Sequence, residues 1–258
     1  MVSQESIVFM AVSGAVAFLL PIGLIVWFKR KYGASLKVFF IGALTFFVFA
    51  QLLESGVHVY VLQVNEMTKE AMQNPLWYGI YGCLMAGIFE ECGRYIMMRF
   101  FMKRHHAWAD GLAFGTGHGG LEAILITGLS SISLIVYAFA INNGTFEQFL
   151  INENIKQALL PIQEQLLHTH SYEWLLGGIE RISAIAVQIG LSLLVLYAVK
   201  SHRLLFLLYS ILLHALFNVP AVLYQKRMIE HAAAVEIIVA LIAAISVYWI
   251  VKAKSLFQ

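Results

Sequence analysis

The stretch IVFMAVSGAVAFLLPIGLIVWF at residues 7–28 contains no charged side chain, and Lys29, Arg30 and Lys31 follow it directly. A run of about 20 apolar residues is long enough to cross the hydrocarbon layer of a bilayer as a helix. No basic segment precedes the run, so the pattern predicts a retained first transmembrane helix that enters with its N-terminus outside. This stretch therefore indicates a membrane protein.

Composition extends this conclusion to the whole chain. Hydrophobic residues make up 60% of the 258 residues and charged residues 12%. In soluble domains, hydrophobic residues average about 45–50% and charged residues about 25%. We therefore predict an all-α polytopic transmembrane helical bundle embedded in a lipid bilayer. The net charge of only +2, without a long basic cluster, argues against a nucleic acid partner.

The apolar runs predict about seven spans, at residues 7–28, 38–63, 76–102, 110–141, 174–199, 203–224 and 231–251. Four glycines around His118 interrupt the fourth run, and glycine weakens a helix. A break in 110–141 would raise the number of spans to eight. We predict a single integral membrane domain over residues 1–258, with its catalytic core in 76–224.

Basic residues in alternate connections predict the orientation in the cell membrane. The connections of one set contain most of these basic residues, namely Lys29, Arg30, Lys31, Lys37, Arg99, Lys103, Arg104, Lys200, Arg203, Lys252 and Lys254. The side richer in Lys and Arg faces the cytoplasm, so we expect the N-terminus outside and the C-terminus in the cytoplasm. Lys226 and Arg227, in the connection at 225–230, are a local contradiction.

The connection at 142–173 is the one long loop, and we place it outside the cytoplasm. Its apolar residues fall at helical spacing and predict an amphipathic helix; they are Ile151, Ile155, Leu159, Ile162 and Leu166. Such a helix either lies on the outer membrane surface or forms a lid over a substrate path.

Three polar pairs inside apolar runs point to a site. Glu90 and Arg94, His118 and Glu122, and His214 and Asn218 are each four residues apart, so each pair shares one helix face. Glu91 adjoins the first pair. With a rise of about 1.5 Å per residue, all lie roughly 12–22 Å from the cytoplasmic helix ends. Charged groups at this depth are costly and mark ion pairs or functional sites. Common depth predicts one buried reactive centre.

Each pair also has a purely structural interpretation. Glu90 and Arg94 can form an ion pair between helices, and His214 with Asn218 can make an interhelical hydrogen bond. Glu122 can fix the tautomer of His118 or simply satisfy it. For Glu54 with His58, Glu180 with Arg181, and Gln188, we expect structural or access-path roles.

The available groups suit hydrolysis by an activated water molecule. A glutamate with a histidine would take a proton from water, and His214 with Asn218 would stabilise the oxyanion. The same donors can instead bind zinc, with Glu90, His118 and His214 as ligands. No His-Glu-x-x-His and no Gly-x-Ser-x-Gly motif occurs. An ion- or proton-coupled transporter is a third possibility, because carriers also use buried Glu and His.

These motifs resemble those of a known group of enzymes. Glu90-Glu91-x-x-Arg94, Phe114-x-x-x-His118 and His214-x-x-x-Asn218 are similar to the three ordered motifs of the CAAX-protease and bacteriocin-processing superfamily of intramembrane endopeptidases. The stretch Gly-His-Gly-Gly-x-Glu at 117–122 most resembles its bacterial YhfC-type branch. The resemblance covers the third to sixth spans.

The resemblance implies a glutamate-dependent peptidase that cuts a membrane-embedded protein or peptide. Glu90 would be the general base, His118 would help to bind the water, and His214 with Asn218 would form the oxyanion pocket. No cofactor is required in this account, although older descriptions of the group treat it as metal-dependent. Arg94 comes one residue sooner than in the prenyl-protein proteases, so Glu91 is an alternative base.

Overall fold

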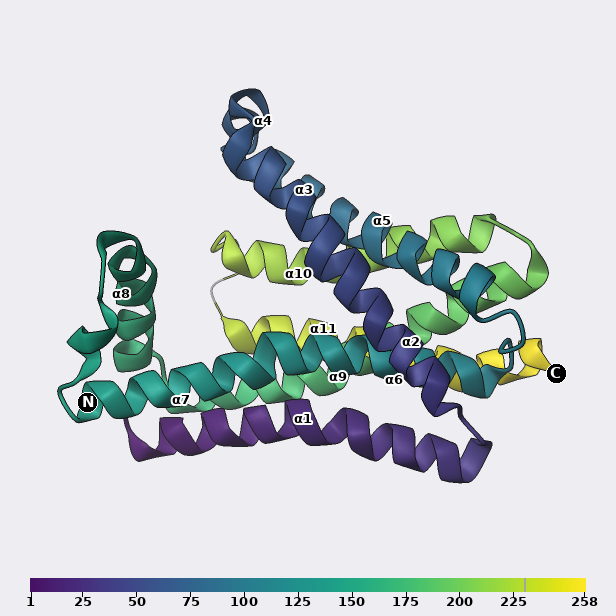
Figure 1. The fold of residues 1–258 in the computed structure, drawn as a ribbon, viewed down its shortest axis with the longest axis horizontal. Helices are drawn as coiled ribbons and strands as arrows, with labels where there is room; N and C mark the ends of the chain where they lie inside the picture. The colour runs from purple at the N-terminus through teal and green to yellow at the C-terminus, as the bar shows by residue number, and fades with distance from the viewer. Residues whose placement is uncertain (230) are drawn as a thin grey trace. The chain divides into compact units, whose positions relative to one another are not determined.

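The computed structural model describes residues 1–229 and 231–258, and this part of the chain is helical, without a β-strand. The α-helices are α1 Gln4–Tyr32, α2 Leu36–Phe46, α3 Ser55–Val59, α4 Glu66–Ala71, α5 Pro75–Phe101, α6 Trp108–Ala123, α7 Leu129–Asn142, α8 Glu153–His168, α9 Ser171–Ser201, α10 Leu205–Gln225 and α11 Ala232–Ala253. The π-helical segments are η1 Phe47–Glu54, η2 Tyr60–Val64 and η3 Ile124–Gly128, and the 3-10 segments are η4 Phe146–Phe149 and η5 Lys254–Phe257. Figure 1 shows their order along the chain. The prediction of an all-α polytopic membrane protein is confirmed.

Six continuous helices within the described residues are long and apolar enough to cross a membrane. They are Gln4–Tyr32, Leu36–Val64, Trp108–Asn142, Ser171–Ser201, Leu205–Gln225 and Ala232–Phe257. The seventh predicted span, 76–102, is helix α5, which is 27 residues long but carries Glu90, Glu91, Arg94 and Arg99. Trp108–Asn142 continues as one helix past His118, so the break considered in 110–141 does not occur.

Local sequence signals set several helix ends. The side chain of Asn74 accepts a hydrogen bond from the Leu76 amide at 2.9 Å, and Pro75 occupies the first turn of α5. Asn152 caps α8 in the same way through the Ile155 amide. After α1, Gly33 adopts a φ of +72°, a conformation that glycine enters without strain and that ends the helix.

Internal packing divides the chain into two units. The first comprises Met1–Leu20 and Ala123–Ile182, and the second comprises Pro21–Glu122 and Ser183–Gln258. The boundaries fall inside α1, α9 and the helix that runs from α6 into α7, so each of these helices contributes to both units.

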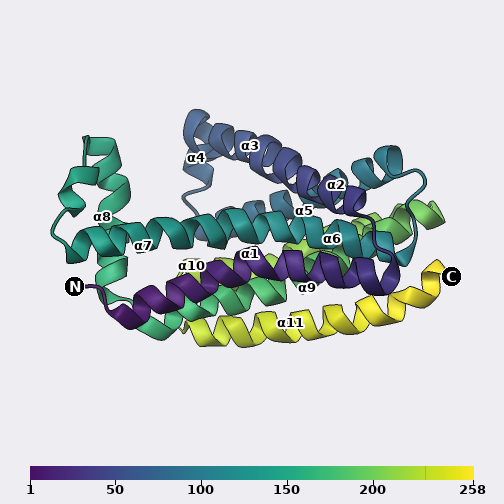
Figure 2. The same ribbon diagram turned by 60° about the horizontal axis from the view of Figure 1, so that its bottom comes forward.

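The first unit contains the amphipathic helix that the sequence predicts. Leu159 and Leu166 of α8 are buried in apolar clusters that include Ala138 and Ala140 of α7. Figure 2 shows α8 beside the end of α7. The apolar stripe of α8 therefore packs on protein, so its burial does not require a membrane surface. Placement of the loop outside the cytoplasm stays a prediction.

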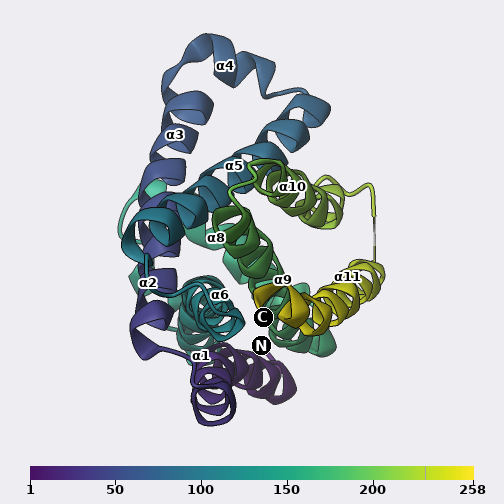
Figure 3. The same cartoon turned by 90° about the vertical axis from the view of Figure 1, so that its right-hand side faces the viewer.

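Close backbone contacts hold the second unit together. A Cβ at Gly117 of α6 would overlap the carbonyl oxygen of Phe39 in α2, and a Cβ at Gly87 of α5 would lie 2.7 Å from the Ile211 oxygen in α10. Glycine at these positions lets the helices touch backbone to backbone. Figures 1 and 3 show α5 and α10 side by side, an arrangement that brings residues 87–94 of α5 near His214.

Candidate active site

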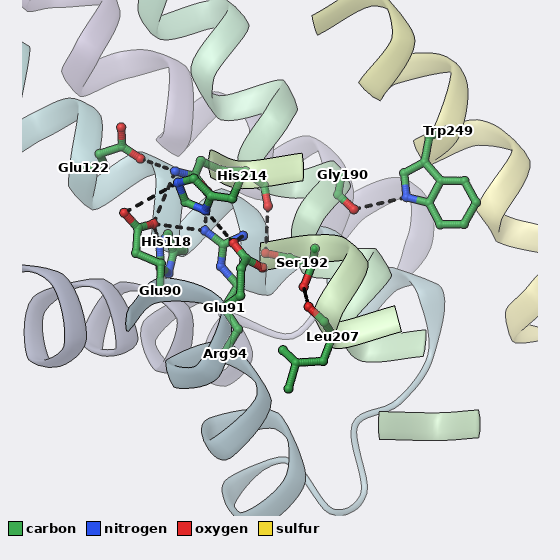
Figure 4. A network of polar contacts seen from close by, with 12 residues as sticks. Glu90, Glu91, Arg94, His118, Glu122, Gly190, Ser192, Leu207, His214 and Trp249 are labelled. Atoms are coloured by element: carbon green, nitrogen blue, oxygen red, sulfur yellow. Dashed lines mark hydrogen bonds and ion pairs between the residues drawn. The ribbon is translucent and has the colours of Figure 1, made fainter. Parts of the chain in front are cut away.

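Four helices of the second unit place polar side chains in one buried network. Figure 4 shows Glu90, Glu91 and Arg94 from α5, His118 and Glu122 from α6, and His214 from α10. Gln188 of α9 joins them through a hydrogen bond to Glu122. The three predicted polar faces therefore do meet, with the exception of Asn218. Gln188 joins them from a helix on which the sequence predicts only a structural or access-path group.

Glu90 lies at the centre of the network. Its Oε2 atom is 2.8 Å from Nε2 of His118 and 3.3 Å from Nη2 of Arg94. An ionised carboxylate only accepts hydrogen bonds, so in this state the His118 Nε2–H donates to it. Nδ1 of His118 has no hydrogen-bond partner among the described residues.

The second oxygen of Glu90 faces His214. Its Oε1 atom is 3.8 Å from Nε2 of His214. This distance is too long for a direct hydrogen bond. Two polar atoms at this separation can both lie about 2.8 Å from one water oxygen placed between them. Glu90 and His214 are therefore spaced to share a single water molecule.

Glu91 has different partners from Glu90. Its Oε1 atom accepts a hydrogen bond from Nδ1 of His214 at 2.6 Å and lies 3.0 Å from Nη1 of Arg94. The side chains of Glu91 and Arg94 are both 0% exposed, whereas that of Glu90 is 9% exposed. Glu91 thus fixes the orientation of His214 and leaves Nε2 of that ring directed toward Glu90.

Arg94 pairs with both glutamates. Its guanidinium compensates two buried carboxylates, which would otherwise repel each other and resist burial. The guanidinium of Arg94 also donates a hydrogen bond from Nη2 to the side-chain oxygen of Gln188, which helps to hold it in position. The Gln188 amide nitrogen donates to Oε2 of Glu122 at 2.6 Å and lies 3.5 Å from Oε2 of Glu90.

This arrangement corrects one expectation from the sequence. Glu122 does not hold His118, because Glu90 engages Nε2 of that ring and its Nδ1 has no hydrogen-bond partner among the described residues. Gln188 bonds to Arg94 and Glu122, which is compatible with the structural role expected for it. The only sequence signal for Gln188 was an uncharged amide within an apolar helix. The contact of this side chain with Arg94 and Glu122 depends on the rotation of α9 about its axis, which the sequence does not specify.

Aromatic rings enclose His118. Phe114 stacks on the imidazole with ring centroids 6.3 Å apart and planes 22° apart, and Phe46 of α2 meets it edge-on at 5.3 Å. His118 and Phe114 are completely buried. The motif residue Phe114 therefore restrains the ring that contacts Glu90, and Phe46 adds a contact that the motifs do not reveal.

Asn218 lies one helical turn beyond His214 on α10 and is half-buried. Among the described residues, its side chain makes no hydrogen bond to the network. Its role at an oxyanion stays a prediction.

The fold and this network define a multi-pass α-helical membrane protein with a buried centre of carboxylate, imidazole and guanidinium groups. A sequence model described as "YhfC intramembrane metalloprotease" matches residues 16–239. The chain therefore belongs to this family, whose description supports an intramembrane protease.

A curated relative agrees with this assignment. The chain is 90% identical over 258 residues, 100% of both chains, to the "Uncharacterized membrane protein YhfC" of Bacillus subtilis (strain 168). No solved structure shows a significant match.

The family description implies a metal ion, and two imidazoles with a carboxylate are typical zinc ligands. Within the described residues, however, no group of three or more His, Cys, Asp or Glu side chains is placed to hold a metal ion. Glu90 and His118 bond directly to each other, and the positively charged Arg94 lies 3.3 Å from the same Glu90 oxygen. A cation would be repelled there. The residues as arranged do not fit a metal centre.

Proposed function

We propose that this protein is an intramembrane endopeptidase in which Glu90 activates a water molecule to hydrolyse a peptide bond of a membrane-embedded protein or peptide. The 3.8 Å separation between Oε1 of Glu90 and Nε2 of His214 carries this proposal. It leaves one carboxylate oxygen facing a position where a water molecule would contact both side chains. We assign the chain to the CAAX-protease and bacteriocin-processing superfamily on the basis of its three ordered motifs.

In the first step, the water oxygen attacks the carbonyl carbon while Glu90 accepts a proton from the water. The C–O bond forms, and the carbonyl oxygen becomes an oxyanion. His118 donates to the other oxygen of Glu90 and fixes the carboxylate in place. This contact orients Glu90 before the substrate arrives, and such preorganisation lowers the barrier.

In the second step, the C–N bond breaks and Glu90 returns its proton to the leaving nitrogen. The products are a carboxylic acid and an amine, so Glu90 ends the cycle as a carboxylate. His214 stabilises the oxyanion from Nε2–H in its imidazolium form, which carries a proton on both ring nitrogens before the attack and keeps both throughout, and Glu91, bound to Nδ1–H, stabilises the positive charge of that ring. Asn218 is proposed as a second donor from the same face of α10.

The proposal is tested by comparing peptide termini in membranes. Cells that lack the endogenous protein would express the wild type, Glu90→Gln or Glu66→Gln, and new protein termini in the membrane fraction would be identified by mass spectrometry. Glu66 is a matched control because its side chain is 84% exposed on α4. Termini common to wild type and Glu66→Gln but absent with Glu90→Gln support the proposal. Identical termini in all three would contradict it.

A zinc-dependent mechanism with Glu90, His118 and His214 as ligands is the second candidate, favoured by the family description. Metal analysis of the purified active protein and cleavage after treatment with a chelator distinguish the two. We expect cleavage to survive removal of bound zinc. Stoichiometric zinc, with activity lost to chelator and restored by zinc, would establish the metal mechanism instead.

A further inference from the structure

The buried position of the site raises the question of how water reaches it. Counted over the whole residue, backbone included, the exposed fraction is at most 7% for each of Glu90, Glu91, Arg94, His118 and His214. Hydrolysis consumes one water molecule per cleavage, and the hydrocarbon layer of a bilayer contains almost none. A route with hydrogen-bonding groups is therefore needed between the site and an aqueous surface.

A second polar cluster lies in the same unit. Nε2 of His58 is 3.1 Å from Oε1 of Glu54, and Nδ1 of the same ring is 2.8 Å from the hydroxyl of Tyr81. Glu54 ends the π-helical segment η1, His58 lies in α3, and Tyr81 lies in α5. The π-helical turns shift the faces of a helix, and they are frequent at functional sites.

This cluster begins beside the proposed site. Segment η1 packs against α5, where a Cβ at Gly93 would lie 2.4 Å from the ring of Phe49, and Glu54 follows Phe49 by five residues in η1. Tyr81 precedes Glu90 on α5 by nine residues, which is roughly 14 Å along the helix. The cluster therefore covers somewhat more than half of the roughly 24 Å between Glu90 and the end of α5 near Asn74.

Exposure increases along the cluster. The side chain of Glu54 is 9% exposed and that of His58 is 31% exposed. Beyond them, Tyr60 accepts a hydrogen bond from Asn65, which also caps α4. Polar groups thus continue from the buried carboxylate to the helix end, while the neighbours Leu52 and Leu53 are exposed and apolar.

We propose that Glu54, His58 and Tyr81 form the path by which water reaches Glu90. This role rests on the proposed function, because a protein that does not hydrolyse needs no such supply. A carboxylate accepts hydrogen bonds, while imidazole and phenol groups both donate and accept. Both ring nitrogens of His58 are engaged, so a passing water molecule would bind to the second carboxylate oxygen of Glu54 and to the hydroxyl of Tyr81, which His58 holds in place. The cluster supplies the reactant and takes no part in bond breaking.

Cysteine labelling tests the path without any need for a substrate. Three single-cysteine variants would be made in a background that carries Cys83→Ser and Cys92→Ser; they are Glu54→Cys, His58→Cys and Leu53→Cys. Membrane vesicles that contain each variant would be treated with a water-soluble methanethiosulfonate reagent. Leu53 is the matched control, because it adjoins Glu54 and is 49% exposed but apolar. We expect Glu54→Cys and His58→Cys to react at least about 10-fold faster, since the reactive thiolate requires a hydrated position. Equal or faster labelling of Leu53→Cys would overturn the proposal.

Cleavage provides the second measurement, with a substrate identified by the terminal-peptide comparison. Glu54→Leu should lower kcat and leave KM unchanged, whereas Glu54→Gln, which keeps hydrogen-bonding groups, should retain most of kcat. Wild-type kcat in Glu54→Leu would overturn the water path. If Glu54→Leu does not fold, the labelling result decides. If the wild type itself cleaves nothing, the proposed function fails, and that outcome is distinct from failure of the labelling prediction.

Discussion

Nδ1 of His214 donates a hydrogen bond to Oε1 of Glu91 at 2.6 Å and joins α10 to α5 through residues 123 positions apart. The bond separates the two adjacent glutamates by role. Glu91 is occupied by His214 and Arg94, whereas Glu90 keeps an oxygen directed toward Nε2, the second ring nitrogen of His214. Adjacent residues on a helix point about 100° apart, so one side chain can position while its neighbour reacts.

Replacement of Glu91 by Gln should therefore lower stability as well as activity. The change removes one of two carboxylates from buried Arg94 and weakens the support of His214. Breaking a buried ion pair costs about 3–5 kcal/mol. Thermal unfolding in detergent should show a clearly lower midpoint than for Glu66→Gln. An unchanged midpoint would show that Glu91 does not hold the helices together.

Gln188→Leu should lower stability through a different contact. The substitution removes the hydrogen bonds that the amide makes with Arg94 and Glu122, and a hydrogen bond to a charged group contributes about 1.5–3 kcal/mol. Gln51→Leu is the matched control, because Gln51 is exposed. Unfolding midpoints of the two variants are to be compared. Equal midpoints would contradict the place of Gln188 in the network.

Gly117→Ala tests the close approach of α6 and α2. An added methyl group would overlap the Phe39 carbonyl and force the helix that carries His118 to move. Overpacking of this kind costs about 1–3 kcal/mol. Gly82→Ala is the control, because a Cβ there meets no atom within 4 Å. We expect a lower unfolding midpoint and lower cleavage for Gly117→Ala alone. Similar behaviour of both variants would count against it.

The orientation in the membrane also yields a prediction. Basic residues at Lys29, Lys31 and Lys37 favour the cytoplasmic side for the connection between the first two spans. Single cysteines introduced at Ser3 and Ser255 in the cysteine-free background should therefore differ in labelling of intact cells. An impermeant reagent should modify Ser3→Cys and leave Ser255→Cys intact. The reverse pattern would place the N-terminus in the cytoplasm.

The helices were predictable because a bilayer imposes a strong local rule. Every backbone group in hydrocarbon must be satisfied within its own segment, so a long apolar run becomes a helix. The run at 38–63 illustrates this rule, since it corresponds to Leu36–Val64. Helix α5 is less apolar because it carries Glu90 and Arg94. The run at 76–102 was nevertheless long enough to predict this helix.

The site was predictable only in part. Spacing of four residues identified which side chains share a face, and common depth indicated that the faces would meet. Neither observation specifies the rotation of each helix about its axis. The partnership of Gln188 with Arg94 and Glu122 depends on that rotation. The π-helical turns before Glu54 likewise shift its face in a way that an α-helical count does not show.

The most direct measurement is the cleavage rate of Glu90→Gln in membranes, relative to wild type at equal amounts of folded protein. Loss of a general base lowers rates by about 10²–10⁴-fold. We expect a loss in this range, in addition to any fall in the unfolding midpoint that follows from removing one carboxylate partner of buried Arg94. Cleavage by Glu90→Gln at the wild-type rate would contradict the assignment of Glu90 as the base.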